Sequence, residues 1–165
     1  TFEYGSISEA GMLVTIVLMM TGGAPGSTAG GMKVTTLFAV CIAAANDLRR
    51  KEDVNCFGRR LDETSIHKAF SILQIYTALL LIGTTAISLI EPVPLIRAMF
   101  ECASALGTVG LTTGITPGLG PVSKSILILF MYFGRVGVLT LSLGFLMGDK
   151  AQERFRYANT NLLIG

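Results

Sequence analysis

Long apolar runs, separated by glycine-rich or charged segments, dominate this chain. Two of them, 69–90 and 126–147, approach the roughly 20 residues that an α-helix needs to cross the hydrocarbon layer of a bilayer. A third apolar stretch, 11–45, is interrupted by glycines. The pattern predicts an all-α membrane protein with three crossings.

Residues 91–125, which lie between the two long apolar runs, are typical neither of a membrane-spanning helix nor of a surface loop. Pro92 and Pro94 end the first run. Residues 95–106 are then mostly apolar but too few to cross a bilayer, and they are followed by a glycine- and threonine-rich run at 107–114. We expect a re-entrant half-helix followed by irregular backbone. Such backbone is tolerated at membrane depth only where it is buried or lines a water-filled cavity.

The first apolar stretch contains a related interruption. A half-helix is expected over 11–20, the run TGGAPGSTAGG occupies 21–31, and helical character resumes over 32–45. An unwound, glycine-rich break inside a hydrophobic span is typical of a transport site or a gate. The alternative is an ordinary loop between two core helices, which the apolar residues on both sides disfavour.

Positive charge is concentrated in two places along the chain. The first group is Arg49, Arg50, Lys51, Arg59, Arg60 and Lys68, and the second is Lys150, Arg154 and Arg156, whereas only Arg97 and Lys124 lie between the long runs. The positive-inside rule therefore predicts that 46–68 and the C-terminus are cytoplasmic. The chain is 51% hydrophobic and 15% charged, and its net charge of +2 is too small to imply a nucleic-acid partner.

Thr108-Val109-Gly110-Leu111 is the leading candidate for ion chemistry. A cation that crosses a membrane exchanges its hydration shell for protein oxygens, and backbone carbonyls supply them where glycine permits the required backbone. The tripeptide Thr-Val-Gly is a weak signal alone, but here it directly follows the expected half-helix. The sequence thus predicts K⁺ coordination by the carbonyls of Thr108, Val109 and Gly110. The alternative is a turn that only links two helices.

Longer motifs resemble a known family. The run PLIRAMFECASALGTVGLTTGITPGLG and the later FMYFGRVGVLTLSLGF are similar to the last pore repeat of the Trk/Ktr/HKT superfamily of potassium transporters, and most similar to the bacterial Ktr-type membrane subunit. Upstream, GGAPGSTAGGMKVTT resembles the gating loop of the third repeat, and the terminal LLIG resembles the family's C-terminal end. Because such proteins contain four helix–pore-loop–helix repeats, we expect the earlier repeats to precede Thr1.

The resemblance implies a division of the chain. It assigns 1–45 to the second helix of the third repeat with its intramembrane gating loop at 21–31, 46–68 to a cytoplasmic loop, 69–148 to the fourth repeat and 149–165 to a cytoplasmic tail. Within the fourth repeat, helices at 69–90 and 126–147 flank the pore helix and filter at 95–114.

The same resemblance assigns the site residues. Thr108, Val109, Gly110 and Leu111 correspond to one quarter of a selectivity filter, and the gate comprises Gly22, Gly23, Gly26, Ser27, Thr28, Gly30, Gly31, Lys33 and Arg135. Leu111-Thr112 stands where the potassium-channel filter TVGYG has Tyr-Gly, which implies fewer or looser ion sites. A transporter of the same fold that also conducts sodium, and a non-conducting membrane scaffold subunit, remain as alternatives.

Arg135 lies near the middle of the last apolar run, between Gly134 and Gly137. A charged side chain at that depth costs about 2.5–3.5 kcal/mol on insertion scales, so we expect it to face water or polar backbone. The resemblance implies a partner for carbonyls of the gating loop. A buried pair with a carboxylate of the missing repeats is the alternative. For Glu101, two interpretations stand side by side: attraction of cations at the pore mouth, or capping of a neighbouring helix.

Other functional classes find little support. Met32 separates Gly31 from Lys33, so the glycine-rich break is not a Walker loop, and no catalytic motif points to an enzyme. The resemblance implies a multi-pass protein of the cell membrane, surrounded by lipid. It also implies a homodimer of the full-length chain and a cytosolic regulatory ring subunit that binds nucleotide. No covalently bound cofactor is expected; K⁺ is the transported ion and Na⁺ a candidate coupling ion.

Overall fold

The computed structural model of the chain describes residues 7–27, 29–49, 55–56, 59–60 and 62–137. Within these residues the α-helices are Glu9–Met20 (α1), Val34–Leu48 (α2), Glu63–Ile90 (α3), Leu95–Gly107 (α4) and Pro121–Val136 (α5), with a 3₁₀ turn at Thr116–Gly118 (η2). Two-residue strands, Asn55–Cys56 (β1) and Arg59–Arg60 (β2), pair antiparallel with Asn55 opposite Arg60. The chain is therefore helical, as predicted, although this short strand pair was not expected.

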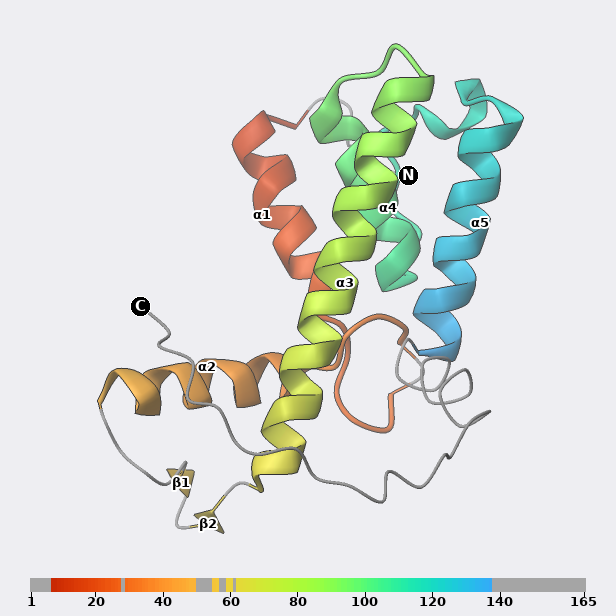
Figure 1. The fold of residues 1–165 in the computed structure, drawn as a ribbon. Coiled ribbons are helices and arrows are strands. Elements are labelled where there is room, and N and C mark those ends of the chain that lie inside the picture. The colour runs from red at the N-terminus through yellow and green to blue at the C-terminus, as the bar shows by residue number, and fades with distance from the viewer. Residues whose placement is uncertain (1–6, 28, 50–54, 57–58, 61, 138–165) are drawn as a thin grey trace, which may run out of the picture.

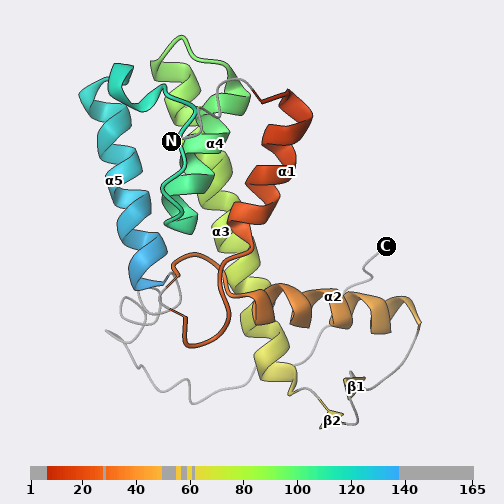
Figure 2. The same ribbon diagram turned by 180° about the vertical axis from the view of Figure 1, so that it is seen from behind.

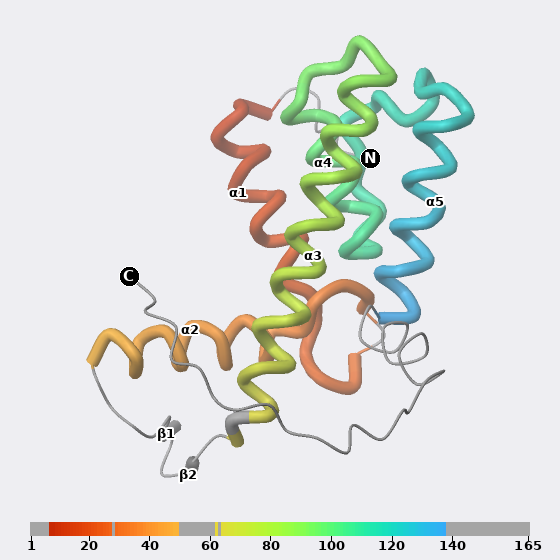
Figure 3. The backbone as a smooth tube through the Cα atoms, viewed as in Figure 1, coloured from red at the N-terminus to blue at the C-terminus, as the bar shows by residue number. Residues whose placement is uncertain are grey.

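Helix α4 lies at the centre of the bundle and packs against α1, α3 and α5 (Figures 1 and 2). The chain leaves α3, turns at the prolines before Leu95 and runs back along α4 for part of the length of α3. It then reverses again, and 108–115 returns beside α4 towards η2 and α5 (Figure 3). The expected half-helix at 95–106 is thus observed, one residue longer.

The reversal after α4 has a local cause. Thr108 adopts a left-handed conformation, with φ 51° and ψ 39°. Its N–H donates to the carbonyl of Ala105 at 3.1 Å, and the N–H of Val109 donates to that of Ser104 at 3.0 Å. A left-handed residue at a helix end stops the helix and redirects the chain, so α4 ends here and does not continue.

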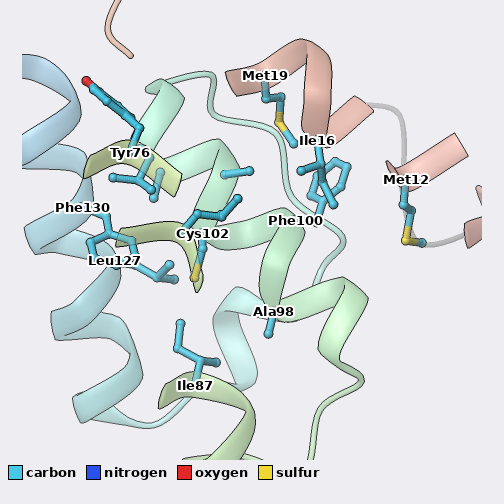
Figure 4. Packing of buried hydrophobic residues seen from close by; sticks show 14 of the residues in the cluster. Met12, Ile16, Met19, Tyr76, Ile87, Ala98, Phe100, Cys102, Leu127 and Phe130 are labelled. Atoms are coloured by element: carbon cyan, nitrogen blue, oxygen red, sulfur yellow. The ribbon is translucent and has the colours of Figure 1, made fainter. Parts of the chain in front are cut away.

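The core of the bundle is built around α4. Figure 4 shows Ile16 and Met19 of α1 on one side of Phe100, and Leu127 and Phe130 of α5 beyond Cys102 on the other. Phe100 is fully buried, as is most of α4 from there to its C-terminal end. The half-helix is therefore enclosed by the three neighbouring helices.

The outer faces of those neighbours are apolar as well. Exposed large hydrophobic residues include Val14, Val17 and Leu18 on α1, Leu81, Ile82 and Leu89 on α3, and Ile128, Leu129 and Tyr132 on α5. Soluble monomers rarely expose contiguous apolar surfaces of this kind. Such faces suit contact with lipid or with further protein segments.

Helix α3 is the described helix that is both long and apolar enough to cross a membrane. Its stretch Thr64–Ile90 has a mean hydropathy of 1.8, and its 27 residues correspond to about 40 Å of helix. Helices α1 and α2 are apolar but shorter.

Two helix boundaries differ from the predictions. Helix α3 begins at Glu63 rather than 69, because the polar residues before the apolar run continue the helix. Helix α5 spans Pro121–Val136 rather than 126–147: Pro121 suits the first turn of a helix, and Gly137, with φ 84°, ends it. Residues 138–147, together with the predicted tail at 149–165, lie outside the described residues.

The expected helix after the glycine-rich break is present as α2. It does not continue in the direction of α1 but lies across the lower end of the bundle and packs on α3 (Figures 1 and 2). The segment 21–33 therefore joins two helices that point in different directions.

Candidate functional site

The candidate filter follows the C-terminal end of α4. Thr108 is β-branched and has a positive φ, a conformation that is uncommon for such residues. Gly110 has a φ of 82°, and nothing lies within 4 Å of the position that a Cβ would occupy. Glycine is therefore required at 110 by the backbone conformation and not by lack of space.

The carbonyl oxygens of this segment are not engaged by the rest of the described chain. Among the hydrogen bonds between described residues, none is accepted by the carbonyls of 108–111. Val109 and Gly110 are exposed, whereas Thr108 and Leu111 are half-buried. The C-terminal end of α4, which carries partial negative charge, lies directly beside these oxygens. A row of unengaged carbonyls at a helix C-terminus is suited to replacing the water around a cation.

The loop 21–33 is closed on itself at its base. Gly22 N–H donates to the carbonyl of Met32 at 2.6 Å, and Val34 N–H donates to that of Gly23 at 3.2 Å. The Lys33 Nζ spans the loop and donates to the carbonyls of Ser27 at 3.1 Å and Ala29 at 2.7 Å. Lys33 therefore lies within the loop and fastens its two sides together.

The same loop docks on the candidate filter. Gly30 N–H donates to the Thr108 Oγ1 at 2.9 Å, and Gly31 N–H donates to the carbonyl of Gly134 at 3.1 Å. A Cβ on Gly30 would clash with Thr108 Oγ1 and lie 2.9 Å from the Gly134 carbonyl oxygen. Figures 1 and 2 both show the loop under the C-terminal end of α4. The small residues thus allow the loop to meet α5 backbone to backbone and to reach the Thr108 side chain.

The remaining predicted gate residues take different places. Gly22 and Gly23 lie at the base of the loop, whereas Gly26 has an open environment and a φ of 83°. The Ser27 hydroxyl accepts from Ala29 N–H at 3.1 Å. Thr28 lies outside the described residues. Of the described loop residues, Gly30 and Gly31 are therefore the ones that hydrogen-bond to the candidate filter and to α5.

Residues 1–154 match the TrkH family, described as cation transport proteins. The chain belongs to this family. The potassium/sodium uptake protein NtpJ of Enterococcus hirae is 33% identical over 170 residues, which cover 100% of this chain and 38% of that protein. The Ktr system potassium uptake protein B of Bacillus subtilis is 33% identical over 165 residues (100% and 37%), and that of Vibrio alginolyticus is 33% identical over 158 residues (96% and 34%).

The resemblance drawn from the motifs is therefore confirmed, and the family is one of transport proteins and not of enzymes. The chain spans less than two fifths of the length of these three relatives.

Arg135 occupies a different position in this TrkH-family chain from the one that its sequence context predicts. It lies in the last turn of α5 and is exposed, so it is not at the middle of a helix. A cation in this turn is favoured by the helix dipole. Together with Gly30, Gly31 and Lys33, Arg135 lines a cavity of about 340 Å³ between the loop, α3 and α5. Arg135 therefore lies at the end of a helix and not near its middle, and its expected place facing water or polar backbone stays a prediction.

Glu101 is the polar residue whose placement sequence reasoning missed. It is 5% exposed, and its Oε1 accepts from the Thr112 hydroxyl at 2.7 Å, the Thr113 N–H at 2.8 Å and the Thr113 hydroxyl at 3.0 Å. Its Oε2 accepts from the Thr116 hydroxyl at 2.8 Å. Among the described residues, its partners belong to the segment 112–116 and not to the first turn of a neighbouring α-helix. A carboxylate in an apolar half-helix followed by a threonine-rich segment was the available signal.

Glu91, which is half-buried, makes a second set of carboxylate contacts, at the N-terminal end of α5. Its Oε1 accepts from Gly120 N–H at 2.7 Å and from the Ser123 hydroxyl at 3.1 Å. An acidic group at a helix N-terminus satisfies otherwise unpaired N–H groups there. Glu91 therefore joins the end of α3 to the start of α5, away from the filter.

Proposed function

We propose that this chain supplies one quarter of a potassium-selective filter, Thr108 to Leu111, and the mobile gate beneath it, which is formed by the loop 21–31 with Lys33 and Arg135. In the full-length protein, the fourth pore repeat at 69–148 and three further repeats surround one ion path through the cell membrane. The supporting observation is that the loop hydrogen-bonds directly to the first residue of a segment with unengaged carbonyls.

Two arguments identify the proposed ion: the chemistry of the carbonyl oxygens and the names of the related proteins. Neutral carbonyl oxygens suit a monovalent cation that sheds its water readily. Two relatives carry potassium uptake in their names, and NtpJ carries potassium/sodium uptake. Potassium is therefore the proposed substrate, and a filter that also passes sodium is the second candidate because NtpJ is named for both ions.

The proposed assembly follows the relatives named as parts of a Ktr system. We infer a homodimer of the full-length chain, embedded in lipid, with a cytosolic nucleotide-binding ring as regulator. Under this proposal, the segment 46–68 and the tail 149–165 face the cytosol, where such a ring docks. The apolar outer faces of α1, α3 and α5 support the lipid contact.

The filter is tested by Gly110→Ser in the full-length protein. A side chain at a φ of 82° strains the backbone and displaces the carbonyls on either side. We expect the potassium concentration for half-maximal uptake to rise about tenfold, with stronger inhibition by sodium. Tracer uptake in bacteria that lack other potassium uptake systems measures both quantities.

Gly114→Ser is the matched control for this experiment. Gly114 has a φ of 87° and an equally open environment, so it carries the same backbone strain outside the filter segment. It should lower stability and change ion preference less than Gly110→Ser does, because it lies outside residues 108–111. Unchanged affinity and sodium sensitivity in Gly110→Ser, or equal changes in both variants, would refute the filter role.

A further inference from the structure

Behind the proposed filter, a single carboxylate holds the segment that continues from it. Glu101 lies on α4, and three threonines that follow Leu111 donate four hydrogen bonds to its two oxygens at 2.7–3.0 Å. Thr113 contributes both its N–H and its hydroxyl, so the backbone itself is held at this point. The carbonyls of 108–111 receive no comparable support within the described residues. The position of the filter therefore depends on its two ends: the left-handed turn at Thr108 and the anchor at Glu101.

The partners of Glu101 are all neutral. Thr112, Thr113 and Thr116 supply one backbone N–H and three hydroxyls, and none of these groups brings a positive charge to the carboxylate. A buried carboxylate without such donors would be unfavourable. These neutral partners satisfy the carboxyl oxygens without a counter-charge among the described residues that bond to them.

That charge lies close to the filter. Glu101 lines a cavity of about 510 Å³ together with Thr108, Gly110, Leu111 and Thr112. Charges act more strongly in such a partly enclosed environment than in bulk water. A fixed negative charge on the same cavity as the filter backbone favours a cation there.

We propose that Glu101 is the positioning residue of this filter quarter: it anchors Thr112–Thr116 so that the Gly110 and Leu111 carbonyls keep their places, and its charge raises the affinity for a monovalent cation. The proposal rests on the filter function proposed above. It assigns ion preference to a side chain that lies behind the filter and contributes no coordinating oxygen of its own.

The test compares Glu101→Gln with Glu91→Gln in the full-length protein. Both variants replace a carboxylate that accepts hydrogen bonds from backbone and hydroxyl donors, but Glu91 serves the α5 N-terminus and not the filter. In Glu101→Gln, the amide NH₂ faces hydroxyl donors and the charge is lost. We expect the half-saturating potassium concentration to rise about tenfold and the preference for potassium over sodium to fall, whereas Glu91→Gln should change only the melting temperature.

A second variant keeps the charge and removes donors. Thr112→Val with Thr116→Val leaves Glu101 held only by Thr113, and we expect a smaller loss of ion preference, about threefold. This variant carries the test if Glu101→Gln fails to fold. Wild-type ion preference and affinity in both Glu101→Gln and the double valine variant, or equal effects of Glu101→Gln and Glu91→Gln, would overturn the proposal.

The outcome for Gly110→Ser shows whether a negative result contradicts the anchor role of Glu101 or the filter role of residues 108–111. If Gly110→Ser alters ion preference and the Glu101 variants do not, the filter stands and the anchor is wrong. If Gly110→Ser has no effect, the filter proposal itself fails, and any change in the Glu101 variants reflects another site.

Discussion

Two glycine-rich segments, 21–33 and 108–116, each follow a short helix in this chain, and they are held in different ways. The segment after α4 is fastened to the buried carboxylate of Glu101 by four hydrogen bonds. The loop after α1 is fastened mainly to itself, through its own backbone and Lys33. Between described residues, two hydrogen bonds join it to 108–111 and α5: Gly30 to Thr108 and Gly31 to Gly134.

The difference has a physical consequence. Neutral backbone hydrogen bonds contribute about 0.5–1.5 kcal/mol each, and bonds to a buried charge contribute about 1.5–3 kcal/mol. Releasing the loop as a closed unit breaks the two outer bonds, whereas releasing the 112–116 segment strands a carboxylate. A filter requires a fixed backbone and a gate requires a movable one, so this contrast agrees with the proposed roles.

The largest effect on the loop is expected from Gly30→Ala. The added Cβ clashes with Thr108 Oγ1 and approaches the Gly134 carbonyl, so the loop is forced away from both partners. Losing two hydrogen bonds costs about 1–3 kcal/mol, and we therefore expect uptake velocity to rise about tenfold through a shift towards the open state. Initial rates of tracer uptake by reconstituted full-length protein measure this.

Gly26→Ala is the matched control for Gly30→Ala, because Gly26 lies in the same loop with open space around it and a φ of 83°. It adds the same methyl group and should leave velocity within about twofold of wild type. If Gly30→Ala folds but shows normal or reduced uptake velocity, the loop is not a gate that opens by leaving Thr108 and Gly134. The proposed difference between a movable loop and a fixed 108–116 segment would then be wrong.

A smaller effect is expected from Arg135→Ala. Arg135 lines the cavity between the loop, α3 and α5, and we expect its loss to weaken loop docking and raise velocity several-fold. Because it sits in the last turn of α5, its loss should lower stability by no more than about 1 kcal/mol. If Arg135 instead pairs with a buried carboxylate of another repeat, the penalty should be about 3–5 kcal/mol with loss of uptake.

Melting temperature and initial rate, measured on one preparation of Arg135→Ala, separate these outcomes, and Arg135→Lys serves as the charge-retaining control. The combination of Gly30→Ala with Arg135→Ala sharpens the test. Two parts of one gate should give less than the sum of their separate effects, whereas strict additivity would show that they act independently.

The smallest effect is expected from Lys33→Met. The Lys33 ammonium donates to the carbonyls of Ser27 and Ala29 in an exposed part of the loop, where water competes for the same groups. We expect velocity to rise about twofold, because the loop becomes less rigid but keeps its contacts with Thr108 and Gly134. Lys33→Arg should resemble wild type; a tenfold effect of Lys33→Met would mean that the loop owes its shape mainly to this side chain.

The sequence alone determined the helical class, the half-helix before residues 108–111, the glycine-rich break and the family. These features are local: apolar composition and length predict helices, while Pro92, Pro94 and the glycines of 107–114 forbid them. Each family motif is a continuous stretch of sequence, so it can be recognised without knowing which segments are in contact in the folded protein. The predicted helix ends were less accurate. Polar residues before 69 can belong to a helix or to a loop, and a glycine after Gly134 can lie within a helix or end it, so the local sequence does not fix these boundaries.

The tertiary structure alone decided which of these features come together. The contact between Gly30 and Thr108 joins residues 78 positions apart, and its geometry depends on α1, α4 and α5 packing around one core. The same packing buries Glu101 against three threonines and leaves Arg135 exposed at the end of α5. Hydrophobic patterning sets which faces are apolar, but hydrogen bonds between distant backbones form only after the helices have packed, because their directions depend on every intervening turn.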